Sequence, residues 1–90
     1  MRVALICIDK IGALQTRLDN RAAHLAHIAE TGVVEMAGPF LNESGQMTGS
    51  LVILNVDTVE NAQEWAMLDP YSKAGLFQSV TISEWKKVIG

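Results

Sequence analysis

The sequence has a single cysteine, Cys7, so neither a disulfide within the chain nor a zinc site built from cysteines can form. Cys7 lies inside the apolar run of residues 3–8, which favours a buried small side chain over a nucleophile. The seven lysines and arginines are scattered, and the net charge is −3. Because binding to a phosphate backbone needs clustered positive charge, we expect no nucleic-acid partner.

Long apolar runs are also missing. The longest is far below the roughly 20 residues that a membrane-spanning helix needs, so we expect no membrane contact. The short apolar run after Arg2 ends at Asp9 and Lys10 and does not have the pattern of a signal peptide. We therefore expect a cytoplasmic protein.

Hydrophobic residues, by contrast, are abundant: they make up 49% of the 90 residues. A single domain over residues 1–90 buries only about 60% of the surface that its unfolded chain exposes. The surplus of apolar side chains predicts that part of the surface is covered by a ligand or by a second copy, in a homodimer or a higher assembly.

Four segments have the short apolar or alternating patterns typical of strands: residues 3–8, 33–37, 48–56 and 79–85. The second is expected to end at Gly38-Pro39, because proline cannot donate a hydrogen bond to a strand ladder. A polar turn with Gly45 between the second and third predicts a hairpin.

The first helical segment covers residues 13–30. Its apolar residues recur three and four apart and form one stripe: Leu14, Leu18, Ala22, Leu25 and Ala29. Asp19 and Asn20 are good N-cap residues, which predicts a break and a main helix over residues 21–30. Gly32 suits the left-handed position that ends a helix.

The second helix is expected to begin at Asp57-Thr58, with Asp57 and Glu60 as a capping box, and to end at Asp69-Pro70. The order βαββαβ predicts an α+β, ferredoxin-like fold with a four-stranded antiparallel sheet and both main helices on one face. The first and third strands are apolar on both faces, so an open apolar sheet face would remain, which is the physical basis for expecting a dimer.

Chemistry is expected at the flank of the first helix. Arg21 and His24 lie three residues apart on one side of the apolar stripe, and Arg17 joins them if the helix is unbroken. His24 is a candidate for proton transfer and the arginines for anion binding; the alternative is that these are ordinary surface residues. His27 is expected to point toward solvent.

A second group surrounds the end of the second helix. Asp69 can orient an imidazole, or can simply terminate the helix before Pro70. Trp65 and Tyr71 are core or dimer contacts or line an aromatic-binding pocket. His24 and His27 with one aspartate would also fit a two-histidine, one-carboxylate metal site, but we favour a site without metal or cofactor.

Several of these segments, in this order, resemble the motifs of the YciI-like (YCII-related) family: Arg21-Ala-Ala-His24-Leu25, Gly38-Pro39, Thr48-Gly49-Ser50, Ala62-x-x-Trp65 and Asp69-Pro70-Tyr71. Ala22 is a departure, because many members have proline there. The resemblance implies a dimeric α+β barrel with a His–Asp dyad, here His24 and Asp69, with Asp9 as the reserve carboxylate. One member is similar to a dehydrochlorinase acting on a chlorinated hydroxyquinol, and related folds isomerise lactones.

We therefore predict a cofactor-independent enzyme, of a dehydrochlorinase, isomerase or lyase type, acting on a small cyclic or aromatic anionic metabolite. His24 and Asp69 would be catalytic. The residues expected to bind substrate are Arg21, Ser50, Trp65 and Tyr71. The main alternative is a dimeric module that binds a small molecule without turnover, and a haem- or flavin-handling monooxygenase is a third.

Overall fold

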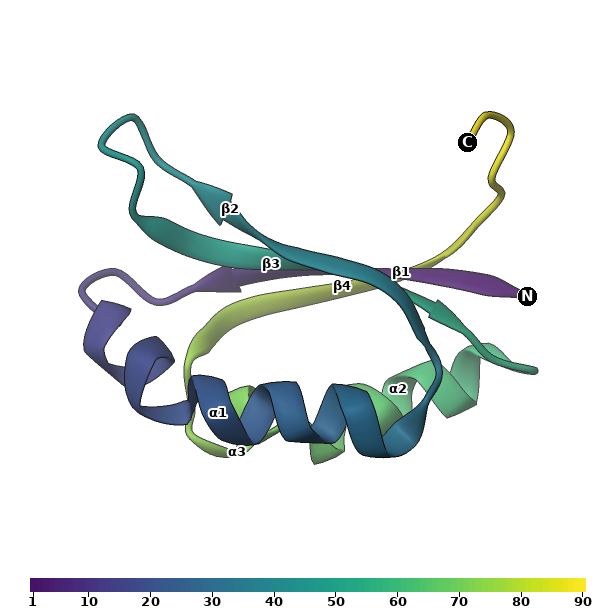
Figure 1. The fold of residues 1–90 in the computed structure, drawn as a ribbon, viewed down its shortest axis with the longest axis horizontal. Helices are drawn as coiled ribbons and strands as arrows, with labels where there is room; N and C mark the ends of the chain where they lie inside the picture. Colours follow the sequence, from purple (N-terminus) through teal and green to yellow (C-terminus); the bar gives the residue numbers. More distant parts are fainter.

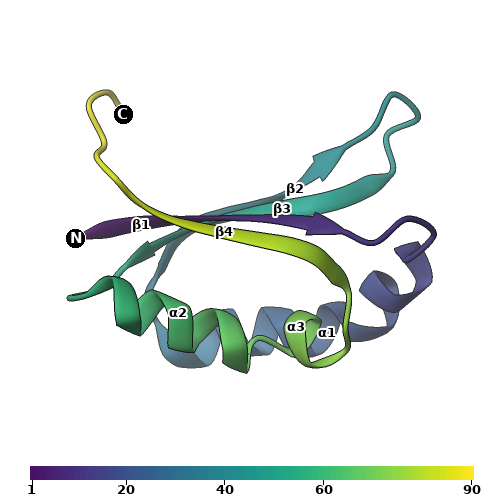
Figure 2. The same ribbon diagram turned by 180° about the vertical axis from the view of Figure 1, so that it is seen from behind.

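The computed structural model describes residues 1–90, and its elements follow the predicted order. They are β1 (Arg2–Asp9), α1 (Leu14–Thr31), β2 (Val34–Leu41), β3 (Met47–Asn55), α2 (Val59–Leu68), α3 (Pro70–Lys73) and β4 (Phe77–Trp85). The strands form one antiparallel sheet in the order β2-β3-β1-β4, with all helices on one face (Figures 1 and 2). The ferredoxin-like α+β fold is thus confirmed.

The hydrophobic core lies between the sheet and α2. Alternate residues of β1 and β3 point toward the helices, where α2 adds three side chains. The fully packed members are Val3, Leu5, Cys7, Val52, Leu54, Ala62, Trp65 and Ala66. α1 supplies only partly buried side chains to this cluster, such as Ile28. The half of the sheet under α1 is therefore less completely filled, and this is where a cavity forms.

The predicted break in the first helix is wrong, because α1 is continuous from Leu14 to Thr31. The two polar residues that suggested a break bond instead to groups one turn earlier. Asp19 accepts a hydrogen bond from the Gln15 side chain at 2.8 Å, and the Asn20 amide donates to the carbonyl of Thr16 at 2.9 Å. The C-terminal prediction is confirmed, since Gly32 has a φ of 66° in the left-handed region.

Two other boundaries also differ from the predictions. Gly38-Pro39 does not end the second strand, which continues to Leu41. β2 is an edge strand that pairs with β3 on one side only. Proline, which has no N–H to donate, is tolerated there because the other side of the strand needs no ladder bond. At the start of α2 the cap is Thr58, whose hydroxyl accepts from the Asn61 backbone N–H at 3.1 Å, rather than Asp57.

The buried face of α1 is not the predicted apolar stripe. Leu18 and Leu25 are 47% and 44% exposed, whereas Arg17 and His24 are buried. The helix therefore turns the side that carries Arg17 and His24 toward the sheet. Each of these buried polar groups needs a hydrogen-bond partner there. No buried side-chain nitrogen or oxygen is left without one.

The opposite face of the sheet carries no helix (Figures 1 and 2). Its register places mostly apolar side chains side by side across three strands. They are Ala4, Ile6 and Ile8 of β1, Leu51 and Ile53 of β3, and Met36 and Phe40 of β2. Ile6, Ile8 and Met36 are 41–52% exposed, so the open apolar face expected from the sequence is present. None of the helices combines the length and hydrophobicity needed to span a membrane.

Candidate active site

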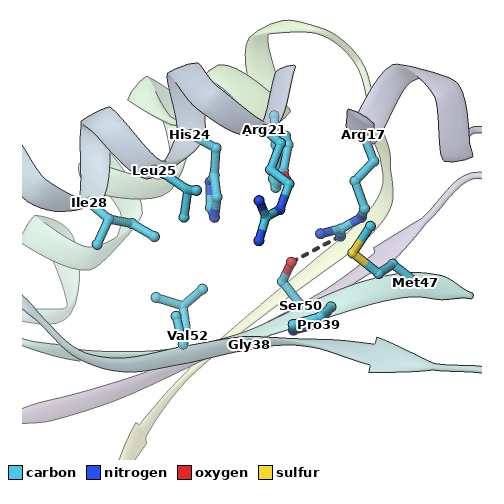
Figure 3. A pocket seen from close by; sticks show the side chains of 12 residues that line it. Arg17, Arg21, His24, Leu25, Ile28, Gly38, Pro39, Met47, Ser50 and Val52 are labelled. Atoms are coloured by element: carbon cyan, nitrogen blue, oxygen red, sulfur yellow. Dashed lines mark hydrogen bonds between the residues drawn. The ribbon is translucent and has the colours of Figure 1, made fainter. Parts of the chain in front are cut away.

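A cavity of about 120 Å³ lies between α1 and the β2–β3 half of the sheet. Figure 3 shows Arg17, Arg21 and His24 pointing into it from the helix, while Ser50 and Val52 point toward them from β3. Apolar residues from both sides complete the lining: Leu25, Ile28, Ala37, Pro39, Met47 and Val52. The cavity is therefore polar at one side and apolar at the other.

His24 and Asp69, 45 residues apart in the chain, are in direct contact. The His24 Nδ1 and the Asp69 Oδ1 are 2.8 Å apart, and both side chains are buried. Because an ionised carboxylate only accepts hydrogen bonds, a neutral His24 paired with it would carry its proton on Nδ1 and keep the lone pair on Nε2. Nε2 has no protein partner, and His24 lines the cavity.

The position of Asp69 is fixed by the start of α3. Its Oδ1 also accepts the backbone N–H of Tyr71 at 3.0 Å, which makes Asp69 the N-cap of that short helix. Pro70 occupies the first helical position, where its missing N–H is no loss. The Asp-Pro-Tyr sequence thus aims one carboxylate at His24 through local backbone geometry.

Arg17 and Asp9 form a second buried pair. Arg17 donates to the two Asp9 carboxylate oxygens at 2.7 and 2.8 Å, and its Nη2 also donates to the Ser50 Oγ at 2.9 Å. Burial opposes the charge of Arg17, but the hydrogen bonds and the charge of Asp9, together with Tyr71, outweigh it and raise the pKa of the guanidinium. Asp9 is thereby bound to Arg17 and does not partner His24.

Tyr71 lies between the two pairs. Its ring stacks on the His24 imidazole with centroids 4.0 Å apart, and the Arg17 guanidinium carbon lies 4.7 Å from its centroid. Burial raises the pKa of the Tyr71 phenol, even though the charges of Arg17 and Arg21 act in the opposite direction. Tyr71 is 1% exposed, so the stack holds the imidazole ring in a single orientation.

Arg21 is the cavity-lining cation that has no carboxylate partner and can therefore bind an anionic ligand. None of the three ion pairs of the protein includes it, whereas Arg17 is bound to Asp9. Arg21 is exposed and lines the cavity, so it can meet an anion that enters from solvent.

Comparison with known proteins identifies the family of this chain. The YCII-related domain family matches residues 1–86. The chain belongs to this family. A protein named YciI from Escherichia coli is 39% identical over 89 residues, which cover 89% of this chain and 91% of that protein. An uncharacterized protein from Haemophilus influenzae is 33% identical, with 98% and 99% covered.

Two solved structures resemble this YCII-related chain. One is 5-chloro-2-hydroxyhydroquinone dehydrochlorinase (TftG) from Burkholderia phenoliruptrix, in complex with 2,5-dihydroxybenzoquinone. It is 33% identical, has a TM-score of 0.87, and the match covers 96% of this chain and 94% of that one. The other, At3g17210 from Arabidopsis thaliana, has a TM-score of 0.53 at 11% identity and shows only the shared fold.

Of the predicted site residues of this YCII-related chain, Arg21, His24, Ser50 and Tyr71 line the cavity. Asp69 contacts His24, but Trp65 lies elsewhere. Trp65 belongs to the core and donates from Nε1 to the Thr31 hydroxyl at 2.8 Å. His27 packs on the Trp65 ring with centroids 4.5 Å apart, rather than pointing to solvent as predicted. No three metal-ligating side chains come together.

Cys7 and the Arg17–Asp9 pair complete the surroundings of the site. Burial, with a smaller contribution from the Asp69 charge, raises the pKa of the Cys7 thiol to about 12, so it stays protonated at neutral pH. The pairing of Asp9 with Arg17 was not predicted from the sequence. The seven-residue spacing of Arg17 and His24 places both on one face of an unbroken helix, but it does not indicate which carboxylate meets Arg17.

Proposed function

We propose that this chain is a cofactor-independent enzyme that moves a proton on a small, anionic, hydroxylated ring. The observation that supports this is the His24–Asp69 contact at the wall of a cavity. With its Nδ1 proton held by Asp69, the imidazole can accept a proton at Nε2, and the carboxylate stabilises the imidazolium that results.

The cavity lining supports this class of ligand. A volume of about 120 Å³ is of the order needed for one ring, since a cavity of roughly 150 Å³ admits benzene. Leu25, Ile28 and Val52 offer apolar contact to the ring. Arg21 can attract an anion, and Tyr71 keeps the imidazole oriented beside it.

The reaction class that fits is elimination or isomerisation. The name of the similar dehydrochlorinase describes loss of HCl from 5-chloro-2-hydroxyhydroquinone. In such a step one ring hydroxyl loses its proton and becomes a carbonyl, while the chlorine-bearing ring carbon gains a proton. A base then takes the proton of a second ring hydroxyl, that oxygen becomes a carbonyl, and the electron pair moves through the ring to expel chloride. One proton and one chloride are released in total. We propose His24 as the base for a step of this kind.

The first test uses the wild-type protein and named compounds. We expect 2,5-dihydroxybenzoquinone to bind with a measurable Kd in calorimetry, and 5-chloro-2-hydroxyhydroquinone or a related hydroxylated ring to be converted, with release of one proton and one chloride from the chlorinated compound. Binding of these compounds without conversion of any of them would favour the alternative, a module that binds a small molecule without turnover. Absence of binding would contradict the proposed ligand class.

We also propose that the chain forms a homodimer through the open sheet face and that it is cytoplasmic. Exposed Ile6, Ile8 and Met36 make a contiguous apolar surface of the kind that marks interfaces. We expect a dimer in sedimentation at micromolar concentration and a monomer for Ile6→Glu. Ile11→Glu is the control, because Ile11 is 98% exposed in the loop before α1. A monomeric wild type would contradict the dimer.

A further inference from the structure

The hydroxyl oxygen of Ser50 accepts a hydrogen bond from Arg17, which leaves the hydroxyl proton free to be donated elsewhere. Ser50 is 4% exposed, and its Oγ accepts a hydrogen bond from Arg17 Nη2 at 2.9 Å (Figure 3). A guanidinium has donors and no acceptor, so Ser50 cannot donate back to Arg17. Its own proton has no acceptor among the protein atoms, and Ser50 lines the cavity.

Arg17 is in turn fixed by Asp9. The two bonds to the carboxylate oxygens set the plane of the guanidinium, and Asp9 balances its charge. Because Ser50 accepts from a charged donor, its O–H bond is polarised and becomes a stronger donor itself. Arg17 therefore contributes to the cavity through Ser50 and does not need to touch a ligand.

We propose that Ser50 donates a hydrogen bond to an oxygen of the bound ring, opposite His24, and that Arg17, anchored by Asp9, is the positioning residue that orients the hydroxyl. This inference rests on the proposed function and specifies the ligand further. The ring must present an acceptor oxygen, such as a phenolate or a quinone carbonyl, toward β3. Its reacting hydroxyl must face α1, where the His24 Nε2 takes the proton.

The test measures the Kd of 2,5-dihydroxybenzoquinone by calorimetry. Ser50→Ala should weaken binding by about 10- to 100-fold, the usual effect of losing a hydrogen bond to a charged or strongly polar group. Thr48→Ala is the matched control, because Thr48 is an exposed hydroxyl on the same strand and lies outside the cavity lining. The control should leave Kd unchanged.

A double-mutant cycle tests whether Arg17 acts by orienting Ser50 or only by stabilising the fold. Arg17→Lys keeps a cation near Asp9 but cannot hold Ser50 and the carboxylate in one plane. If Arg17 acts through Ser50, its effect on Kd should shrink by at least about threefold when Ser50 is already alanine. A residue that merely stabilised the fold would weaken binding equally in both backgrounds.

The outcomes distinguish this inference from the proposed function. An unchanged Kd for Ser50→Ala, with the wild type binding the quinone, overturns the donor role and leaves the role of His24 intact. Additive losses in the cycle overturn the role assigned to Arg17. Failure of the wild type to bind the quinone overturns the ligand class itself, and this inference with it.

Discussion

Replacing His24 with glutamine is expected to lower kcat by about 10²- to 10⁴-fold on the ring that the wild-type protein converts. Glutamine keeps a polar side chain of similar size next to Asp69 but cannot accept a proton at neutral pH. KM should change less than kcat, because Arg21 and the apolar walls remain. Steady-state rates of substrate loss give both constants.

His27→Gln is the matched control, with the same substitution three residues away on α1. His27 contacts Trp65 and does not line the cavity, so kcat should stay close to that of the wild type. The assignment of His24 as the base would be wrong if His24→Gln kept full turnover. Equal losses in both variants would indicate damage to the helix instead.

Replacing Arg17 with methionine is expected to cost about 3–5 kcal/mol of the free energy of unfolding. Methionine fills much of the space but leaves the buried Asp9 carboxylate without its cation and the Ser50 oxygen without its donor. Urea denaturation followed by circular dichroism measures this change. In a domain whose total stability is of the order of 5–15 kcal/mol, the loss is large.

Arg21→Met is the control for this loss. Arg21 is exposed and unpaired, so its stability change should stay within about 0.5 kcal/mol. The double variant Asp9→Leu with Arg17→Met should recover much of the loss, because an apolar pair can replace a buried ion pair. A small effect of Arg17→Met alone would show that Asp9 is not held as a buried charge.

The overall topology was predictable because each strand carries its own pattern. The alternation of Val80 and Ile82 with serine and threonine fixes which face of β4 meets the core, and the βαββαβ order then leaves few arrangements. The boundaries at Asp19 and Pro39 were wrong for local reasons. Propensities describe an isolated segment, whereas α1 is stabilised by bonds one turn apart and β2 is an edge strand.

The face of α1 could not be read from its hydrophobic pattern. The apolar stripe predicts that Leu18 and Leu25 face inward, but burial of Arg17 and His24 is made favourable by carboxylates that lie outside the helix. Asp9 and Asp69 supply those partners from the end of β1 and the start of α3. Charge pairing between a helix and a neighbouring strand has no sequence period, which explains why the pair of Arg17 with Asp9 was missed.

The tautomer of His24 tests the central claim most directly. Nitrogen NMR of the protein labelled with ¹⁵N-histidine, at a pH at which the imidazole is neutral, identifies the protonated nitrogen. We predict a proton on Nδ1, held by Asp69, and a resonance of Nε2 that shifts when 2,5-dihydroxybenzoquinone is added. A proton on Nε2, or a bound quinone that leaves both His24 nitrogens unchanged, would contradict the proposed role of this histidine.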